Sequence, residues 1–301
     1  MKPASDVGVR RAGLEFRAYL SCVRYQEVLL LQGSPLLGAA FALKEITVES
    51  ALSVLLLALA GFLLVAHIFT FNDWAGIASD SNDPNKSANV FSTRGITPRG
   101  VLLLSAGLLA ASLLVFALLP GRTFLVAVAI AALGLFYSHP SINAKGLPLV
   151  SSSPHLVGGT LHFLLGYSLF GGIDSRGILI AFFFALTFTA GHLNQEVRDY
   201  EGDRLNGVLT NAVAFGRTAA FVAGFLGFTL AYGDLVVLAH AGLVPTPLGT
   251  VPLVLYPLHV FWSARTLRAG LSFENVSRFQ SRYRMLYALI GLTMVVTLLC
   301  H

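Results

Sequence analysis

Apolar stretches about as long as a bilayer is thick recur along the whole chain, and they constrain the fold more than any other feature. A helix needs about 20 mainly apolar residues to cross the hydrocarbon core, and it satisfies its own backbone polar groups there. Only 12% of the residues are charged, against about 25% in soluble domains. The sequence therefore predicts an integral, multi-pass membrane protein of the all-α class.

Nine such stretches can be recognised, and each predicts one transmembrane helix. They are centred on residues 28–45, 50–71, 100–119, 122–138, 155–172, 177–194, 218–240, 249–265 and 284–300. They take up most of the chain, and no low-complexity linker separates one part of the sequence from another. We therefore expect a single transmembrane domain over residues 1–301.

The distribution of basic residues indicates how the bundle is oriented. Lys and Arg accumulate in cytoplasmic loops, and 17 of the 20 fall on one side of the membrane if the N-terminus is inside. The other three are Lys44, Arg122 and Arg176. We therefore expect the N-terminus and the two long polar loops, 72–100 and 194–217, on the cytoplasmic side.

The net charge of +5 follows this membrane-facing distribution. Nucleic-acid binding would need a basic face outside the lipid, so we expect anionic membrane lipids as partners and no nucleic acid. Residues 1–25 carry a basic, partly amphipathic pattern typical of an interfacial helix, and they lack the apolar core and cleavage site of a signal peptide. Cys22 and Cys300 fall on opposite sides in this topology, so no disulfide is expected.

The first polar loop begins with spaced acidic residues at the end of a span. Asn72, Asp73, Gly76 and Asp80 occupy positions i, i+1, i+4 and i+8. If the span continues as a helix, Asp73 and Asp80 lie two turns apart on one face. The loop would then present its carboxylates together at the cytoplasmic end of the bundle.

The second polar loop has a similar organisation. Glu196, Asp199 and Asp203 are spaced i, i+3 and i+7, and His192 lies one turn earlier. In both loops, spaced acidic residues at the end of a span are followed by basic residues. This similarity suggests two half-sites that face each other across the bundle.

So many carboxylates near a membrane need a cation, because they repel one another and resist desolvation. Oxygen ligands without cysteine favour a hard ion, and Mg²⁺ binds a few carboxylates while it keeps positions open for substrate phosphates. The interleaved basic residues suit a phosphate-bearing ligand; they are Lys86, Arg94, Arg99, Arg198 and Arg204. The alternative is that the acids are solvated loop charges, and we adopt it for Asp83, Asp174 and Glu201, which do not fit the spacing.

Together, the spans and the two acidic loops resemble the UbiA superfamily of intramembrane prenyltransferases over the whole chain. The family's first motif, N-D-x-x-D-x-x-x-D, is matched by Asn72, Asp73 and Asp80, with Gly76 in place of the middle aspartate. Its second motif, N-D-x-R-D-x-E-G-D-x-x-x-G, is matched by Gln195, Glu196, Arg198, Asp199, Glu201, Gly202, Asp203 and Gly207. The second match is the most specific signal in the sequence.

The resemblance implies nine transmembrane helices around a central cavity open to the cytoplasmic side. It also implies Mg²⁺ as cofactor, an allylic isoprenyl diphosphate as donor and a hydrophobic or aromatic acceptor. The implied metal ligands are Asn72, Asp73, Asp80, Glu196, Asp199 and Asp203, of which Asp73, Asp199 and Asp203 are the expected catalytic residues.

Further residues are implied as substrate contacts. Lys86 follows Asn85 as in the N-K-P-x-R-P run that often comes after the family's first motif, and Tyr137 and Lys145 match a tyrosine and a lysine between the fourth and fifth spans. Lys145 would contact the diphosphate and Tyr137 would line the cavity. The expected acceptor pocket includes His192 and His162, and the latter shares a helical stripe with His155, Gly158, Gly159 and Gly166. That stripe is either a small-residue packing seam or a wall of the substrate chamber.

Two other functions remain open. A membrane terpene cyclase would have the same fold, and the missing aspartate at Gly76 is compatible with it. A cation-coupled secondary transporter would place its carboxylates near the bilayer midplane, whereas these acids cluster at one surface. The sequence identifies neither the acceptor nor the prenyl chain length.

Overall fold

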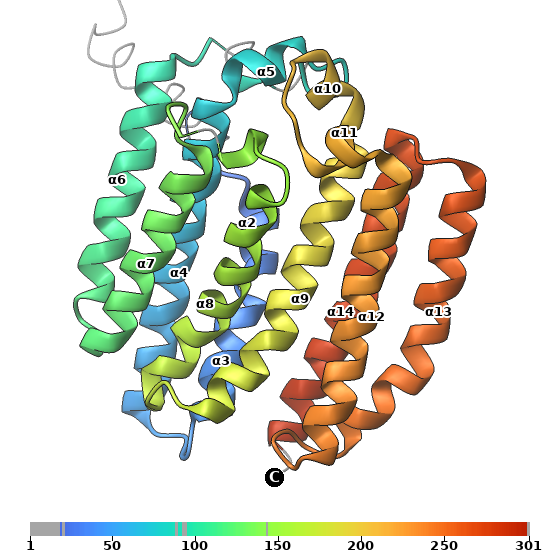
Figure 1. Ribbon diagram of the computed structural model, residues 1–301. Helices are drawn as coiled ribbons and strands as arrows, with labels where there is room; N and C mark the ends of the chain where they lie inside the picture. Colours follow the sequence, from blue (N-terminus) through green and yellow to red (C-terminus); the bar gives the residue numbers. More distant parts are fainter. Residues whose placement is uncertain (1–18, 20–21, 88–89, 92–94, 143, 300–301) are drawn as a thin grey trace, which may run out of the picture.

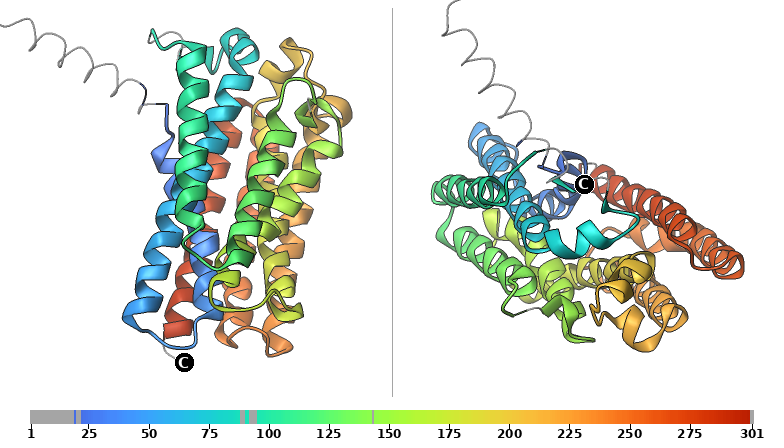
Figure 2. Two further views of the ribbon diagram at one scale, coloured as in Figure 1. Left: turned by 90° about the vertical axis from the view of Figure 1, so that its left-hand side faces the viewer. Right: turned by 90° about the horizontal axis from the view of Figure 1, so that it is seen from above.

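The computed structural model describes the whole chain except residues 1–18, 20–21, 88–89, 92–94, 143 and 300–301. The described part is a bundle of long helices that lie side by side (Figures 1 and 2). In chain order they are α2 (Tyr25–Leu31), α3 (Gly33–Ala42), α4 (Val48–Ala75), α6 (Pro98–Phe116), α7 (Gly121–Ser138), α8 (Ser153–Phe170), α9 (Ser175–Arg198), α12 (Arg217–His240), α13 (Pro247–Ala269) and α14 (Phe273–Leu299).

Short helices connect several of these elements. They are α5 (Ile77–Asn82), η3 (Ala144–Gly146), η4 (Val150–Ser152), α10 (Tyr200–Leu205) and α11 (Asn211–Phe215). Figure 1 shows α5, α10 and α11 together at one end of the bundle. The connections from α3 to α4, from α6 to α7 and from α8 to α9 lie at the other end. The two polar loops therefore meet at a single end.

The helices confirm the all-α class, and six of those described are long and apolar enough to cross a membrane. These six are α4, α6, α7, α9, α12 and α14. The other predicted stretches also fall within helices: α2 with α3, α8 and α13. That all nine cross the bilayer stays a prediction.

The prediction that residues 28–45 form a single helix is wrong. The chain forms α2 and α3 instead, with a break at Gln32, and it becomes extended at Leu43. The ring of Pro35 leaves no backbone N–H to bond the carbonyl of Leu31, so the hydrogen-bond ladder is interrupted at this junction. The 1–25 interfacial segment lies almost entirely outside the described residues.

Polar caps fix where the spanning helices begin. Thr47 and Ser50 exchange hydrogen bonds in a capping box at the start of α4. Asp174 starts α9, and its carboxylate accepts hydrogen bonds from the Gly177 N–H (2.7 Å) and the Tyr167 hydroxyl (3.2 Å). Asp174 is therefore a helix cap that satisfies a free backbone donor, and it is exposed, as expected for a solvated charge.

Close backbone contacts hold the centre of the bundle together. A methyl group on Gly166 of α8 would overlap the Pro35 carbonyl of α3, and one on Gly159 would lie 2.8 Å from the Cα of Ala185 in α9. Such small-residue seams let membrane helices approach closely. Of the two interpretations of the α8 stripe, the packing seam therefore holds for these two glycines.

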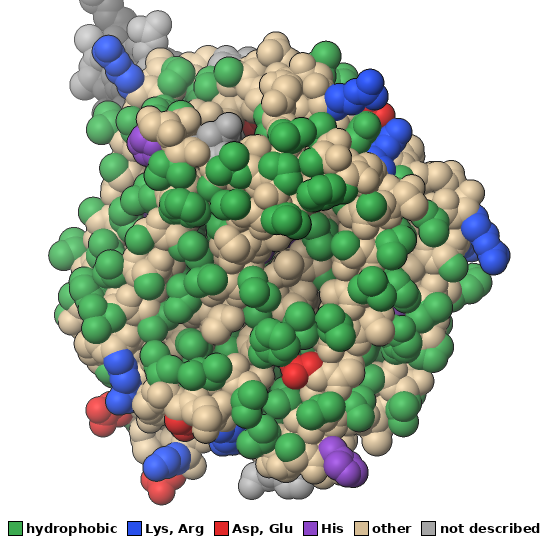
Figure 3. Space-filling view, in the orientation of Figure 1, with side chains coloured by type: hydrophobic (Ala, Val, Ile, Leu, Met, Phe, Trp, Pro, Cys, Tyr) green, Lys and Arg blue, Asp and Glu red, His purple; other side chains and the backbone are tan. Residues whose placement is uncertain are grey.

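The surface of the bundle matches a membrane environment. Hydrophobic side chains dominate the middle of the face in Figure 3, and the Lys and Arg side chains lie mainly toward its two ends. Lys44, Arg122 and Arg176 belong to the connections or helix starts at the end away from α5 and α10. The fold is thus consistent with the charge alternation that predicts its orientation.

We expect the end that carries α5 to face the cytoplasm. In a Cys22→Ser, Cys300→Ser background, Ser81→Cys should react with an impermeant thiol reagent only from the cytoplasmic side, and Gly172→Cys only from the opposite side. Both positions are exposed, so the thiols are accessible to the reagent. Labelling of both thiols from one side in intact cells and inverted vesicles would contradict the orientation.

Candidate active site

The first acidic motif lies on the end of α4 and on α5. The condition that the span continues as one helix through Asp80 is not met, because α4 ends at Ala75 and Gly76 takes φ −89°, ψ 1°. The turn nevertheless stays helix-like, since the Gly76 N–H bonds the Asn72 carbonyl and the Asp80 N–H bonds the Gly76 carbonyl, both at 2.9 Å. Asp73 and Asp80 therefore both line the same small cavity.

The second motif is divided in the same way. Helix α9 ends at Arg198, Asp199 takes φ −88°, ψ 6°, and α10 follows directly. Asp203 lies on α10 and is 7% exposed. Because of this break, Asp199 lies at the junction of the two helices, where Lys86 of the first loop contacts it.

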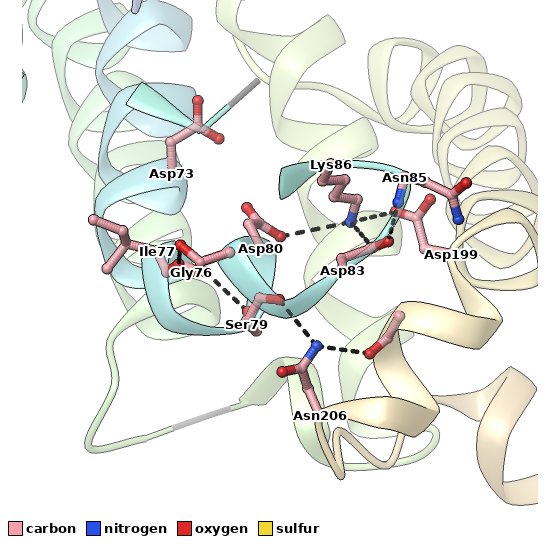
Figure 4. Close-up of polar contacts among 12 residues, drawn as sticks. Asp73, Gly76, Ile77, Ser79, Asp80, Asp83, Asn85, Lys86, Asp199 and Asn206 are labelled. Atoms are coloured by element: carbon pink, nitrogen blue, oxygen red, sulfur yellow. Dashed lines mark hydrogen bonds and ion pairs between the residues drawn. The ribbon is translucent and has the colours of Figure 1, made fainter. Parts of the chain in front are cut away.

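Lys86 joins the two motifs. Its Nζ lies 2.9 Å from Asp199 Oδ2 and 3.7 Å from both Asp80 Oδ1 and Asp83 Oδ2 (Figure 4). Burial alone would lower the pKa of this ammonium, but the carboxylates of Asp199, Asp80 and Asp203 raise it above its ordinary value. Lys86 thus stays cationic and neutralises carboxylates from both loops.

The two acids of the second motif have opposite pKa shifts. Burial favours a protonated Asp199, yet hydrogen bonds and charge from Arg198 and Lys86 hold its pKa below the ordinary value. Burial raises the pKa of Asp203 to about 6, and the nearby Lys145 ammonium opposes this rise. Asp199 therefore stays ionised, whereas an added cation would oppose the raised pKa of Asp203.

Asp83 was missed from the sequence. It was expected to be solvated, but it is 3% exposed, accepts the Asn85 N–H at 2.8 Å and pairs with Lys86. Its carboxylate lies against the backbone of Gly202 on α10. The signal that could have found it is its i,i+3 spacing to Lys86 in the sequence.

Arg24 was also missed. Its guanidinium makes a two-pronged ion pair with the Asp73 carboxylate, and it lies 5.7 Å from the centre of the Phe69 ring. Arg and carboxylate groups often pair in this two-pronged geometry, in which two N–H groups donate to the two carboxylate oxygens. Arg24 lies just before α2, far from either motif in the sequence, so spacing could not indicate it.

The other predicted contacts fall into three groups. Arg198 lies in the site and bonds Asp199 at 2.6 Å and Gln280 at 3.1 Å. Lys145 on η3 and Asn72 form the second group, and both are half-buried. The Asn72 amide oxygen accepts a hydrogen bond from Ser138 at 3.2 Å. The outer group is exposed or lies outside the described residues: Arg99 and Arg204 are exposed, and Arg94 is not among the residues described.

The predicted aromatic and histidine contacts lie deeper in the bundle. The rings of His155 and His192 stack at 3.6 Å, and the Tyr137 ring lies edge-on 5.0 Å from His155 and 6.2 Å from His192. His162 is 5% exposed, and its ring lies 5.8 Å from Phe188. The Tyr137, His155 and His192 rings therefore form one cluster beside Glu196, and His162 lies two turns further along α8.

Glu196 belongs to a separate polar cluster. Its carboxylate is 4% exposed and accepts hydrogen bonds from the Ser151 hydroxyl (3.0 Å), the Asn211 amide (3.1 Å) and the Ala212 N–H (3.3 Å), and it lies 3.0 Å from His192 Nε2. These bonds tie α9 to η4 and α11. They leave Glu196 little capacity to hold a metal ion together with Asp199 and Asp203.

The ligand chemistry of the site, rather than the present spacing of its carboxylates, fits a hard divalent cation. Within the described residues, no three His, Cys, Asp or Glu side chains lie close enough to form a ready metal cluster. Cationic groups lie between the carboxylates instead, since Lys86 bridges Asp80 and Asp199, and carboxylate oxygens are the ligands that Mg²⁺ prefers. A cavity of about 140 Å³ opens beside them, lined by Cys22, Arg24, Asp73, Asp80, Asn85, Lys86, Val90 and Phe91.

The fold and the site together define a helical membrane protein with a cluster of carboxylates and basic groups at one end of its bundle. The chain belongs to the UbiA prenyltransferase family, whose model matches residues 34–294. The family predicted from the two motifs is thereby confirmed.

Two curated relatives are digeranylgeranylglyceryl phosphate synthases. The protein from Haloquadratum walsbyi is 30% identical over 158 residues, which is 51% of each chain. The protein from Natronomonas pharaonis is 33% identical over 138 residues, or 44% of this chain and 47% of that one. The matched segments thus span about half the length of these relatives.

Solved structures share the fold. A UbiA homolog from Archaeoglobus fulgidus, solved with GPP and Mg²⁺ bound, has a TM-score of 0.73 at 18% identity and covers 93% of this chain and 99% of that one. A UbiA homolog from Aeropyrum pernix K1 has a TM-score of 0.72 at 19% identity, with coverage of 91% and 99%. The bundle in Figure 1 is therefore the UbiA fold.

We expect Glu196→Gln to destabilise the protein. The substitution replaces an acceptor of several buried hydrogen bonds with a group that carries donors, and a buried group left unpaired costs about 1–3 kcal/mol. Thermal unfolding in detergent should show a lower midpoint than for Glu201→Gln, a matched control whose carboxylate is exposed and pairs with Arg217. An unchanged unfolding midpoint together with loss of Mg²⁺-dependent activity would contradict this expectation and would support Glu196 as a metal ligand.

Proposed function

We propose that the protein catalyses the Mg²⁺-dependent transfer of a prenyl group from an allylic isoprenyl diphosphate to a lipid-soluble or aromatic acceptor, with release of diphosphate. The observation that carries the proposal is the convergence of carboxylates from two distant loops on Lys86. Such a site can bind a cation and the phosphate groups of a ligand together.

Similar proteins support this proposal. The Archaeoglobus fulgidus homolog has been solved with GPP and with DMAPP, each together with Mg²⁺. The curated relatives are synthases of a prenylated glyceryl phosphate. Both observations agree with an isoprenyl diphosphate donor, and the second with a polar acceptor group that carries a hydrophobic chain.

Four carboxylates would hold the metal ion: Asp73, Asp80, Asp199 and Asp203. Bound there, Mg²⁺ would neutralise charge on the departing diphosphate. Lys86, Arg198 and Lys145 would contact its oxygens, since their cationic groups already lie beside Asp199 or Asp203. These donors are in place before the reaction begins, which favours charge development in the leaving group.

The buried rings below the site would line the reaction chamber. Tyr137 packs against His192, and His162 packs against Phe188, so the prenyl chain and the acceptor would lie against these rings. When the bond between the allylic carbon and oxygen breaks, both electrons leave with the diphosphate, and the acceptor forms a new bond to that carbon and loses a proton. Exclusion of water from this part of the bundle would keep the allylic cation from hydrolysis.

The orientation completes the proposal. The nine helices would cross the bilayer, with the N-terminus inside and the cavity open toward the cytoplasm. The membrane lipids would then surround the hydrophobic faces in Figure 3, and the water-soluble diphosphate would leave toward the cytoplasm.

We expect Asp73→Asn and Asp199→Asn each to reduce Mg²⁺-dependent diphosphate release by about a hundredfold or more, because loss of one preorganised electrostatic group from an active site costs about 10²–10³ in rate. Purified protein would be incubated with allylic diphosphates of several chain lengths, with and without a membrane lipid extract as acceptor source, and the lipid products identified by mass. Glu45→Gln, at an exposed position at the other end of the bundle, is the control. Full activity in both Asp variants would contradict the metal assignment.

The same incubations separate the alternative functions. A lipid product formed from the allylic diphosphate without an acceptor would favour a cyclase. Uptake of a cation by the protein in membranes, without release of diphosphate, would favour a transporter.

Position 76 offers a second test. A Cβ atom there would lie 3.4 Å from Asp80 Oδ2 and 3.1 Å from the Asn72 carbonyl oxygen, so an aspartate would place its carboxylate beside Asp80. A carboxylate about 4 Å from a cation contributes roughly 1 kcal/mol per unit charge in water, or about fivefold in affinity. We therefore expect Gly76→Asp to lower the half-saturating Mg²⁺ concentration relative to Gly76→Asn. Equal Mg²⁺ dependence in three active proteins would place position 76 outside the site.

A further inference from the structure

Asn206 lies in space between the two acidic motifs, and neither motif pattern specifies the residue type at this position. It ends α10, and its side chain faces α5 of the first loop (Figure 4). Its Nδ2 donates to the Ser79 carbonyl at 2.9 Å and to the Gly202 carbonyl at 2.8 Å. Its Oδ1 accepts from Asn82 Nδ2 at 3.2 Å. One side chain thus bonds both short helices.

The local backbone explains why Asn206 can reach across. Gly207 takes φ +66°, and the Val208 N–H bonds the Asp203 carbonyl while the Gly207 N–H bonds that of Arg204. This is the left-handed turn that commonly ends a helix, where glycine has no steric penalty. The turn holds Asn206 at the end of α10, beside the first loop.

The bond to Ser79 meets a need of α5. The last four carbonyls of a helix have no partner within it, and Ser79 lies among them because α5 ends at Asn82. A six-residue helix is too short to be stable alone. The amide of Asn206 therefore supplies a donor that α5 lacks, and α5 in turn carries Asp80.

A second contact links the same two helices. The Asp83 carboxylate lies against Gly202 so closely that a methyl group at position 202 would overlap its oxygens. Asp83 also pairs with Lys86, whose Nζ is 2.9 Å from Asp199. Contact between α5 and α10 thus extends directly to the groups of the candidate site.

We propose that Asn206 is a positioning residue that, together with the Asp83–Gly202 contact, clamps α5 to α10 and sets the separation between Asp80 and Asp199. The inference rests on the proposed function, because that separation matters only if the two carboxylates act on one ligand. Asn206 itself lies outside the ligand set: all of its polar side-chain atoms bond α5 and α10.

The test measures the Mg²⁺ requirement separately from turnover. In purified full-length protein, Asn206→Ala should raise the half-saturating Mg²⁺ concentration by about fivefold, the size that one ordinary hydrogen bond confers, while kcat at saturating Mg²⁺ stays within about twofold. Asn206→Asp should raise it further, because a carboxylate oxygen would face two carbonyls. Ser81→Ala is the control: its hydroxyl bonds only the Ile77 carbonyl of its own helix among the described contacts, and it should leave the requirement unchanged.

The glycine contact supplies an independent arm. Gly202→Ala should raise the Mg²⁺ requirement in the wild-type background but much less in an Asp83→Ala background, where the three atoms nearest to the added methyl group are gone. Additive effects of the two substitutions would overturn the steric part of the clamp. A purely structural role would lower the unfolding midpoint and kcat together with no change in the Mg²⁺ requirement, and that result would overturn positioning.

Hydrogen exchange separates this inference from the proposed function. Amides of residues 77–82 should exchange faster in Asn206→Ala than in Ser81→Ala, with no substrate present. If the wild-type protein releases no diphosphate from any allylic donor, the proposed function fails, and the exchange rates still show whether the clamp exists. If the wild-type protein is active and Asn206→Ala matches it in both Mg²⁺ requirement and exchange, the clamp is overturned.

Discussion

The ion pairs that Lys86 makes across the end of the bundle are the interactions on which the candidate site depends. Carboxylates that are mostly removed from water repel one another and cost free energy unless cations lie among them. Lys86 meets this constraint for Asp80, Asp83 and Asp199 at once, and Arg24 meets it for Asp73. The carboxylates of both loops are thus charge-compensated. In the proposed function, a hard cation and an anionic ligand would enter among these paired charges.

The two motifs reach this arrangement by the same backbone device. In each, a long helix ends, one residue takes φ close to −90° with ψ near zero, and a six-residue helix follows; the residues are Gly76 and Asp199. The interruption changes the direction of the chain at the end of each long helix. The carboxylates that follow it are therefore directed toward the opposite loop. The interruption also explains why Asp199 and Glu196, three residues apart, belong to different clusters: it falls at Asp199, whereas Glu196 remains on α9.

The sequence predicts most of the bundle because hydrophobic length and charge alternation are properties of single segments. The helix positions, the acidic ends and the family follow from them. What it does not predict depends on tertiary contact. Arg24 lies far along the chain from Asp73, and the burial of Asp83 depends on Gly202, so neither has a local signal. Glu196 fits the spacing of the second motif, yet its hydrogen-bond partners come from η4 and α11, which no periodicity could place beside it.

The stability of the bundle and the geometry of the site rest on different parts of the structure. The bundle depends on close backbone seams such as Gly166 against α3 and on buried apolar clusters between the long helices. The acidic motifs lie on α5 and α10, which are too short to be stable by themselves and take their position from each other. Local openings of this kind need much less free energy than global unfolding. The site can therefore adjust to a ligand, or lose its geometry through one substitution, while the membrane bundle stays folded.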